Sequence, residues 1–154
     1  GCFLDTGTRH YVRFVEGLEE YDVVAEGRDI RYNASELMPI GVNVNFVEPY
    51  EGGIKVRTYE KGVEDETFAC GTGVTASSIA TYLYDQKRGF AQKESCIQTP
   101  QGEEYSEIEA VKYDIQALGD KLAVNFKFNK KSRLFSDIYL TGPATFVFET
   151  LIEI

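Results

Sequence analysis

Apolar and polar residues alternate over several short stretches of this chain, the pattern of strands with one buried face. The clearest alternation runs through residues 42–46, 54–57 and 122–129. Further strands are expected at the N-terminus and at His10–Val15, Asp29–Tyr32, Cys96–Thr99, Ile108–Ile115, Ile138–Leu140 and Thr145–Ile154. Glycine-containing turns separate several of these stretches, so the sequence predicts roughly eight strands that are mainly antiparallel.

One stretch has the helical period instead. Four apolar residues spaced three and four apart predict a helix from Gly73 to Lys87, namely Ala76, Ile79, Ala80 and Leu83. A weaker helical turn is expected at Ala34–Leu37. We therefore expect an α+β domain with a mostly antiparallel, curled and barrel-like sheet around one central helix.

Length and charge restrict the class of protein. A chain of 154 residues fits one ordinary domain with its own core. Its 25 acidic and 16 basic residues give a net charge of −9, which argues against binding to nucleic acid or to anionic membranes. The chain has no apolar run of roughly 18 residues, so we expect no membrane span.

The cysteines and the N-terminal residues bear on the cellular setting. Cys2, Cys70 and Cys96 are odd in number and widely spaced, which fits neither a disulfide framework nor a zinc motif. A reducing, cytoplasmic location is the expectation. The first residues lack the features of a signal peptide, and the chain reads as though it begins within a longer protein.

Cys70 is the strongest candidate for chemistry. It directly precedes Gly71, Thr72 and Gly73, where the predicted helix begins. Free backbone N–H groups and the helix dipole at such a position favour the thiolate. The glycines also leave room for a carboxylate to approach the same N–H groups. The alternative is that Cys70 is a small buried apolar residue at a helix start.

The same residues satisfy a second motif. Residues 71–76 (Gly-Thr-Gly-Val-Thr-Ala) match the dinucleotide-binding pattern G-x-G-x-x-A. However, the preceding residues 63–68 are acidic rather than a buried strand, and no second strand ending in an acidic residue follows at the required distance. The pattern therefore favours thiol chemistry over nucleotide binding.

Several segments together resemble the C-terminal half of diaminopimelate epimerases. They are residues 42–47 (Val-Asn-Val-Asn-Phe-Val), 56–62 (Val-Arg-Thr-Tyr-Glu-Lys-Gly) and 67–73 (Thr-Phe-Ala-Cys-Gly-Thr-Gly). Residues 6–12 are similar to the family's Gly-Asn/Ser-Pro-His segment, and residues 140–144 to its closing Leu-Thr-Gly-Pro-Ala. The resemblance spans nearly the whole chain in order and spacing.

The resemblance implies an isomerase of lysine and peptidoglycan biosynthesis that needs no cofactor and no metal. In this family one cysteine thiolate removes the α-proton of LL- or meso-2,6-diaminopimelate, and a second cysteine thiol delivers a proton to the opposite face. Cys70 takes the place of one of these two thiols.

The resemblance also implies roles for other residues. Glu60 would tune Cys70 and contact substrate, and His10 would modulate the other cysteine. The backbone of Gly71 and Thr72 would hold the α-carboxylate. The remaining substrate contacts would come from Asn43, Lys61 and Thr8.

Three departures from the family pattern stand out. The chain contains no Cys-Gly-Asn-Gly element, which carries the second catalytic cysteine in the family's N-terminal half. Lys61 stands where the family has Arg, and a lysine cannot form a bidentate fork with a carboxylate. Thr8 and Arg9 replace the usual Asn/Ser and Pro.

We therefore expect residues 1–145 to form the C-terminal catalytic domain, and residues 146–154 to form a strand that packs on the missing N-terminal domain. Without that partner, the apolar strand could pair two copies in a homodimer. Two alternative functions stay open: a related, proline-racemase-like isomerase with another substrate, and a non-catalytic binding domain of the same fold. The isolated chain is expected to be inactive.

Overall fold

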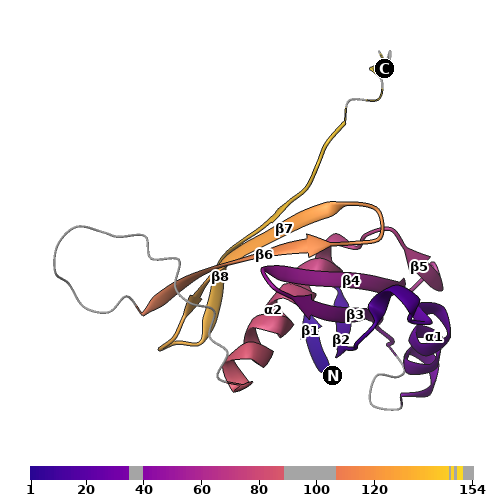
Figure 1. The fold of residues 1–154 in the computed structure, drawn as a ribbon, viewed down its shortest axis with the longest axis horizontal. Coiled ribbons are helices and arrows are strands. Elements are labelled where there is room, and N and C mark those ends of the chain that lie inside the picture. Colours follow the sequence, from indigo (N-terminus) through magenta and orange to yellow (C-terminus); the bar gives the residue numbers. More distant parts are fainter. Residues whose placement is uncertain (35–39, 89–106, 146, 148, 151–154) are drawn as a thin grey trace.

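The computed structural model describes residues 1–34, 40–88, 107–145, 147, 149 and 150. These residues form a sheet of eight strands, a short 3-10 helix and two α-helices (Figure 1). The elements in chain order are β1 (Cys2–Asp5), β2 (Arg9–Phe14), η1 (Leu18–Glu20), α1 (Val23–Asn33), β3 (Asn43–Tyr50), β4 (Gly53–Glu60), β5 (Asp65–Thr67), α2 (Gly71–Arg88), β6 (Ile108–Gln116), β7 (Lys121–Asn129) and β8 (Leu134–Thr141).

The sheet is open and mainly antiparallel. Its strand order is β1-β2-β3-β4-β6-β7-β8, with β1 and β8 at the two edges. Strand β4 joins three neighbours, because its first residues pair with β6 while its last residues pair with β5. The pairs β2–β3 and β4–β6 are parallel. The α+β class is therefore confirmed, whereas the expected barrel-like closure is not found among the described strands.

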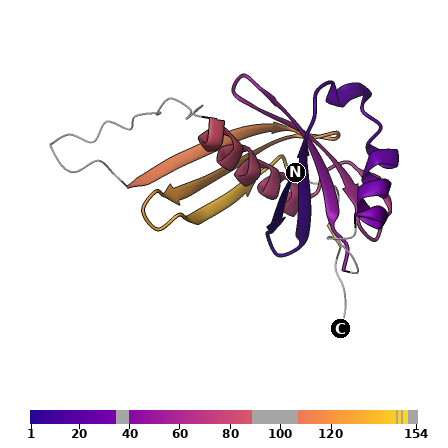
Figure 2. The same ribbon diagram turned by 90° about the horizontal axis from the view of Figure 1, so that it is seen from below.

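Strands β3 and β4 carry a helix on each face. On one face, Val44, Phe46 and Tyr59 pack with η1 and with Val23 of α1. On the other face, Val47 and Val56 belong to a second cluster with residues of α2. Figure 2 shows α2 lying along the sheet, while α1 packs beside β3, β4 and β5. Because both faces are covered, β3 is buried from Asn43 to Val47.

Strands β6, β7 and β8 cover the rest of α2 with one face only. Tyr82 of α2 lies among the rings of Phe126, Phe128 and Phe135. The opposite face is open to solvent, and in β6 and β7 buried and exposed residues alternate. Strand β8 leaves large apolar side chains exposed, including Leu134 (65%) and Tyr139 (61%).

Most of the predicted elements are confirmed. The predicted helix corresponds to α2, and the strands expected at 42–46, 54–57 and 122–129 correspond to β3, β4 and β7. The strands expected at the N-terminus and at His10–Val15, Ile108–Ile115 and Ile138–Leu140 correspond to β1, β2, β6 and β8.

The strand expected at Asp29–Tyr32 is wrong, because these residues lie in α1. Four alternating residues suggested a strand, but the buried positions of the longer segment are Val23 and Gly27, one helical turn apart. The side chain of Asp22 caps this helix by accepting a hydrogen bond from the backbone N–H of Ala25 (3.0 Å).

Three expectations fall wholly or largely outside the described residues. The strand Cys96–Thr99 does so entirely. Of the helical turn Ala34–Leu37, only Ala34 is described, and it is the extended C-cap of α1. Within Thr145–Ile154, none of the described residues lies in a strand. Among the described residues, no helix is both long and apolar enough to span a membrane.

Gly27 offers a test of the packing between α1 and the sheet. A Cβ at this position would lie 2.4 Å from the Cβ of Tyr59. Helix propensity alone would make Gly27→Ala stabilising by about 1 kcal/mol. The close approach reverses that sign, so we expect Gly27→Ala to destabilise the fold by roughly 1–3 kcal/mol, measured by urea unfolding.

The control is Ala25→Gly, at an exposed position of the same helix. It should cost about 1 kcal/mol through propensity alone. A Gly27→Ala variant more stable than the unmodified chain would contradict the close packing of α1 on Tyr59.

Candidate active site

Cys70 lies in the short connection between β5 and α2. Its carbonyl accepts the first helical hydrogen bond, from the N–H of Val74 (2.8 Å), so Cys70 is the residue that caps the start of α2. The N–H groups of Gly71, Thr72 and Gly73 therefore precede the helical hydrogen-bond ladder. The thiol is partly exposed. A partly exposed sulfur beside these N–H groups is suited to proton transfer.

Gly73 is required by a close approach between α2 and β3. A Cβ at this position would lie 2.4 Å from Oδ1 of Asn45 and 3.3 Å from Sγ of Cys70. A side chain there would push the start of α2 away from the sheet. Because Gly73 has no side chain, the thiol of Cys70 lies next to polar side chains on β2 and β3.

Three polar groups meet beside the thiol. Nε2 of His10 lies 2.8 Å from Oγ1 of Thr8 and 3.0 Å from Oγ1 of Thr72. The two threonine hydroxyls are 3.0 Å apart, and Oγ1 of Thr72 is 3.5 Å from Sγ of Cys70. Thr6 adds a hydrogen bond to the backbone carbonyl of Thr72 (3.0 Å). Four of the predicted site residues, Cys70, Thr72, Thr8 and His10, are thus brought together.

A row of polar side chains continues from His10 across the same face of the sheet. Nδ1 of His10 is 3.0 Å from Nδ2 of Asn45, and Oδ1 of Asn45 accepts a hydrogen bond from the hydroxyl of Thr58 (2.9 Å). Thr67 of β5 pairs with Thr58 in the ladder and donates its hydroxyl to Glu60 (2.8 Å). His10, Asn45 and Thr58 are all buried.

Sequence reasoning did not identify Asn45, Thr58 or Thr67 as parts of the site. The alternation along β3 assigned Asn45 to an open, polar face of the strand. The structure instead buries it beneath α2. The available signal was the glycine at position 73, since a helix that starts with small residues can approach a strand closely enough to cover a short polar side chain.

Burial lowers the pKa of His10 below its ordinary value of 6.5, because removal from water disfavours the imidazolium. The negative charges of Glu60 and Asp5 act in the opposite direction, but they are the smaller contributions. His10 is therefore a neutral imidazole near pH 7, with one nitrogen that donates and one that accepts.

The other predicted residues lie around the end of β4. The carboxylate of Glu60 is bonded by Thr67, and its charge acts on His10; no hydrogen bond to Cys70 is found for it in the described part of the chain. Asn43 accepts the backbone N–H of Lys61 (2.8 Å), and Nζ of Lys61 donates to the carbonyl of Ile40 (2.6 Å). These three residues are thus near the thiol cluster rather than bonded to it.

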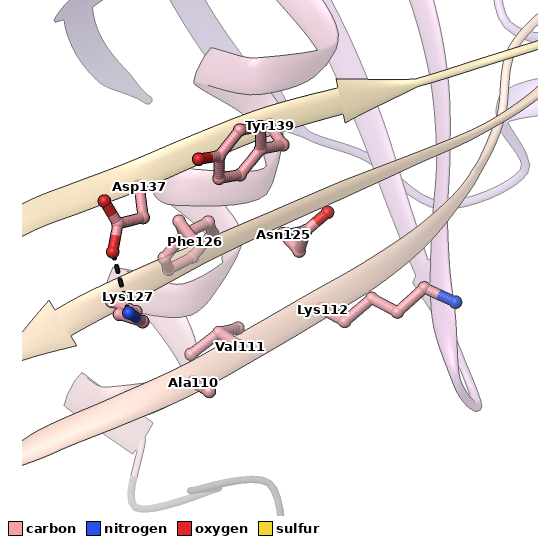
Figure 3. A pocket seen from close by; sticks show the side chains of 8 residues that line it. All are labelled: Ala110, Val111, Lys112, Asn125, Phe126, Lys127, Asp137 and Tyr139. Atoms are coloured by element: carbon pink, nitrogen blue, oxygen red, sulfur yellow. Dashed lines mark ion pairs between the residues drawn. The ribbon is translucent and has the colours of Figure 1, made fainter.

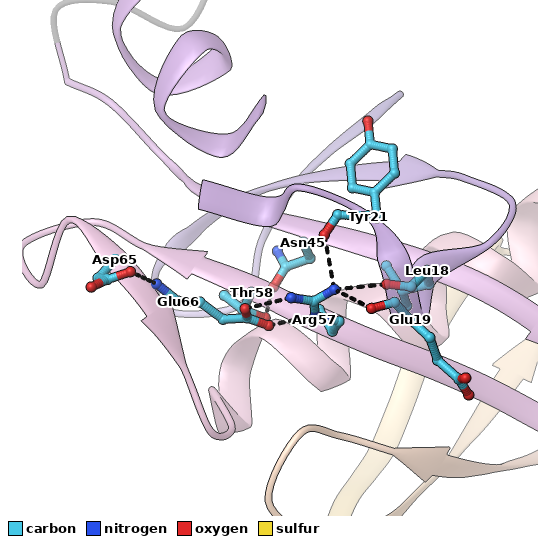
Figure 4. Close-up of polar contacts among 8 residues, drawn as sticks. All are labelled: Leu18, Glu19, Tyr21, Asn45, Arg57, Thr58, Asp65 and Glu66. Carbon is cyan, nitrogen blue, oxygen red and sulfur yellow. Dashed lines mark hydrogen bonds and ion pairs between the residues drawn. The ribbon is translucent and has the colours of Figure 1, made fainter. Parts of the chain in front are cut away.

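An arginine on the opposite face of β4 holds the strand that leads to Cys70. Figure 4 shows the guanidinium of Arg57 between Glu66 and the loop around η1. Nε and Nη2 bind the carboxylate of Glu66 at 2.6 and 2.7 Å, and Nη1 donates to the carbonyls of Leu18, Glu19 and Tyr21. Such a bidentate, mostly buried pair fixes geometry. It ties β5 to β4, and β5 ends three residues before Cys70.

A separate groove lies on the exposed face of β6, β7 and β8 (Figure 3). Its volume is about 370 Å³, and an ion pair between Lys127 and Asp137 (2.8 Å) crosses it. None of its lining residues is Cys, His or Glu, so it offers no counterpart to the thiol cluster. Within the described ranges, no group of three or more His, Cys, Asp or Glu residues could hold a metal ion.

The dinucleotide alternative does not fit the topology. A dinucleotide-binding unit needs a strand before the glycine-rich turn that runs parallel to the strand after the helix. Here the preceding strand β5 is three residues long and pairs antiparallel with β4, whereas β6 runs parallel to β4. Gly71 and Gly73 serve the approach of α2 to the sheet instead.

Fold and site together define an α+β domain that presents a thiol at the start of its central helix, beside a buried histidine. The family model for "Diaminopimelate epimerase" matches residues 2–147. The chain therefore belongs to the diaminopimelate epimerase family.

Individual relatives agree with this assignment. The chain is 40% identical to the diaminopimelate epimerase of Flavobacterium psychrophilum over 97% of this chain and 50% of the relative. It is 35% identical to that of Chlorobaculum tepidum over 99% of this chain and 49% of the relative. A shorter match, 55% identical, covers 54% of this chain and 30% of the Aquifex aeolicus protein. In the two matches that cover nearly all of it, the chain thus spans about half the length of the relative.

The lowered pKa of His10 predicts a pH dependence of stability. Unfolding returns the imidazole to its ordinary pKa of 6.5, so below that pH the unfolded state binds more protons than the folded state. The free energy of unfolding should fall as the pH decreases below 6.5, by at most about 1.4 kcal/mol per pH unit, until the pH reaches the folded-state pKa. Urea unfolding across this range measures the effect.

The control is His10→Gln, which keeps a polar side chain but does not titrate there. Its stability should lack this component, so the difference between the two proteins should shrink as the pH falls. An identical pH dependence in both proteins would contradict a depressed pKa at His10.

Proposed function

We propose that this chain is the C-terminal catalytic half of a cofactor-independent epimerase that interconverts LL- and meso-2,6-diaminopimelate. Membership of the family supports the substrate. The observation that carries the chemistry is the position of Cys70 at the start of α2, with Thr72 at hydrogen-bond distance of its sulfur. This function belongs to the whole protein, and the chain matches about half the length of the relatives.

In the proposed reaction Cys70 serves one face of the α-carbon. As a thiolate it removes the α-proton, forming an S–H bond while the electron pair of the C–H bond moves toward the α-carboxylate. A thiol on the opposite face then returns a different proton to the carbon, and the configuration inverts. In the reverse direction Cys70 is the acid and the other thiol is the base, so no net oxidation or reduction occurs.

The start of α2 supplies the stabilisation that this step needs. An α-proton is weakly acidic, so the charge that develops on the carboxylate must be held by fixed donors. The N–H groups of Gly71 and Thr72 precede the helical ladder and carry the positive end of the helix dipole. We propose that they bind the α-carboxylate beside Cys70.

The remaining roles concern the edge of the site. Glu60 lies close enough to influence His10 electrostatically, which supports a role for its charge near the thiol. We propose that Asn43, Lys61 and Thr8 contact the substrate. Asn43 orders the backbone at Lys61, which would fix the approach to the distal end of the substrate.

The second thiol is expected from a partner domain. The sequence has no Cys-Gly-Asn-Gly element, and the relatives are about twice as long as this chain. We propose that residues 146–154 pack on that N-terminal domain. The exposed apolar side chains of β8 form a surface that this domain would cover. In the absence of the domain, a second copy of this chain would cover the same surface and form a homodimer.

Lys61 keeps a related isomerase with a different substrate as a second candidate. Its ammonium group donates to the carbonyl of Ile40 at 2.6 Å, so it is already engaged within the chain. A lysine in this state is a weaker receptor for a distal carboxylate than the bidentate arginine of the family. Measuring the activity of the full-length protein on a panel of amino acids would show whether diaminopimelate or another amino acid is its substrate.

We expect this chain alone to produce no meso isomer from LL-diaminopimelate, because one face of the α-carbon lacks its acid or base. Fusion to the N-terminal half of the Flavobacterium psychrophilum relative should restore turnover, measured by chiral chromatography. In that fusion Cys70→Ser should lower kcat by at least about a thousandfold, within the range for loss of a general acid–base group.

Cys2→Ser in the same fusion is the matched control, since Cys2 packs against the core of the domain rather than at the start of α2. Clear turnover by the chain alone, or full activity of the Cys70→Ser fusion, would refute the proposed function.

A further inference from the structure

Asn45 is a fully buried amide with a polar partner on each side. In the structure its oxygen accepts the hydroxyl hydrogen of Thr58 (2.9 Å), and its nitrogen faces Nδ1 of His10 (3.0 Å). An amide NH₂ group can only donate. Nδ1 must then act as the acceptor, which leaves the single hydrogen of the neutral imidazole on Nε2.

We propose that Asn45, held by Thr58, is a positioning residue that sets the tautomer of His10, and that this tautomer directs the hydroxyl hydrogen of Thr72 toward Sγ of Cys70. The assignment of the tautomer stands on geometry alone, whereas its importance for proton transfer rests on the proposed function. The resemblance links His10 to the other cysteine of the pair; here it also reaches Cys70, through Thr72.

The two tautomers of His10 differ in the number of hydrogens that they place among three neighbouring polar atoms. Nε2 of His10 and the hydroxyl oxygens of Thr8 and Thr72 form a triangle with sides of 2.8 to 3.0 Å. If Nε2 carries hydrogen, the triangle holds three hydrogens. Nε2–H can donate to the Thr8 hydroxyl, and the Thr8 hydroxyl can donate to Thr72. The hydroxyl hydrogen of Thr72 can then point out of the triangle.

With the other tautomer, the triangle holds only two hydrogens. The bare Nε2 then accepts one hydroxyl hydrogen, and the second hydroxyl donates to the first. The hydrogen of Thr72 is retained within the triangle in both arrangements. In the Nε2–H form Thr72 can therefore donate to the sulfur 3.5 Å away while the triangle keeps two hydrogen bonds, whereas in the other form this donation leaves the triangle with one.

A donor at the sulfur favours the charged form of Cys70. A hydrogen bond to an ionised group stabilises that form, and Thr72 would add such a bond to the N–H groups at the start of α2. Because burial lowers the pKa of His10, the ring stays neutral near pH 7 despite the charges of Glu60 and Asp5. Only the neutral ring has two tautomers, since the imidazolium carries hydrogen on both nitrogens.

The tautomer can be observed directly, because His10 is the only histidine of the chain. We expect a two-bond ¹H–¹⁵N correlation spectrum of the ¹⁵N-labelled chain at neutral pH to show hydrogen on Nε2 and a bare Nδ1. Hydrogen on Nδ1, or rapid averaging of both forms, would overturn the proposal without any variant.

Asn45→Asp reverses the hydrogen bond, since a carboxylate only accepts. We expect Nδ1 to carry hydrogen in this variant. Asn125→Asp makes the same chemical change at an exposed position of β7 and should leave the His10 signals as they are in the unmodified chain. An Asn45→Asp protein that folds and keeps Nδ1 bare would overturn the proposal.

Thr58→Val tests the connection to Cys70 without adding a charge. It frees the amide of Asn45 to turn, so both tautomers should appear in the spectrum. Alkylation of Cys70 by iodoacetamide at neutral pH should slow by roughly threefold or more. Peptide mapping of the alkylated protein distinguishes Cys70 from Cys2 and Cys96. Thr141→Val, at an exposed position of β8, is the control and should react at the unmodified rate.

An unchanged alkylation rate in a Thr58→Val protein with mixed tautomers would overturn the connection through Thr72. These measurements need neither the second thiol nor diaminopimelate. Failure of the fusion protein to turn over substrate would therefore refute the proposed function while leaving the tautomer result intact.

Discussion

The structure depends on the burial of a polar row on the face of a sheet. His10, Asn45 and Thr58 come from three neighbouring strands and are covered by α2. Each donor and acceptor in such a place must find a partner within the protein, because an unsatisfied buried group costs about 1–3 kcal/mol. The polar row meets this requirement through hydrogen bonds between neighbouring members. It runs from Thr72 on α2 to Thr58 on β4.

This requirement determines where the thiol lies. The helix can close over Asn45 only because Gly73 has no side chain, and the same contact brings Cys70 beside Thr72 and His10. On the opposite face, Arg57 ties β5 to β4 through Glu66, so the segment that enters the helix is held as well. The position of Cys70 is thus set from both faces of the sheet, which favours a defined geometry over a mobile loop.

The two parts of the sheet have different relations to solvent. Strands β2 to β4 are covered on both faces, and they carry the polar row. Among the described elements, only α2 covers strands β6 to β8, and β8 leaves apolar side chains exposed at the open edge. Large apolar side chains at an open sheet edge form a surface that another chain or domain can cover.

The sequence by itself determined the elements with strong periodicity, and it pointed to Cys70 because a cysteine before Gly-Thr-Gly at a helix start has local chemical consequences. It misassigned Asp29–Tyr32, since four residues do not distinguish a period of two from a helical turn. Only the tertiary structure decided which polar residues are buried. Asn43 and Asn45 read alike along the strand, yet one orders the backbone of Lys61 and the other orients His10. That difference arises because contacts between strands distant in sequence, and the approach of α2, leave no periodic signal in the chain.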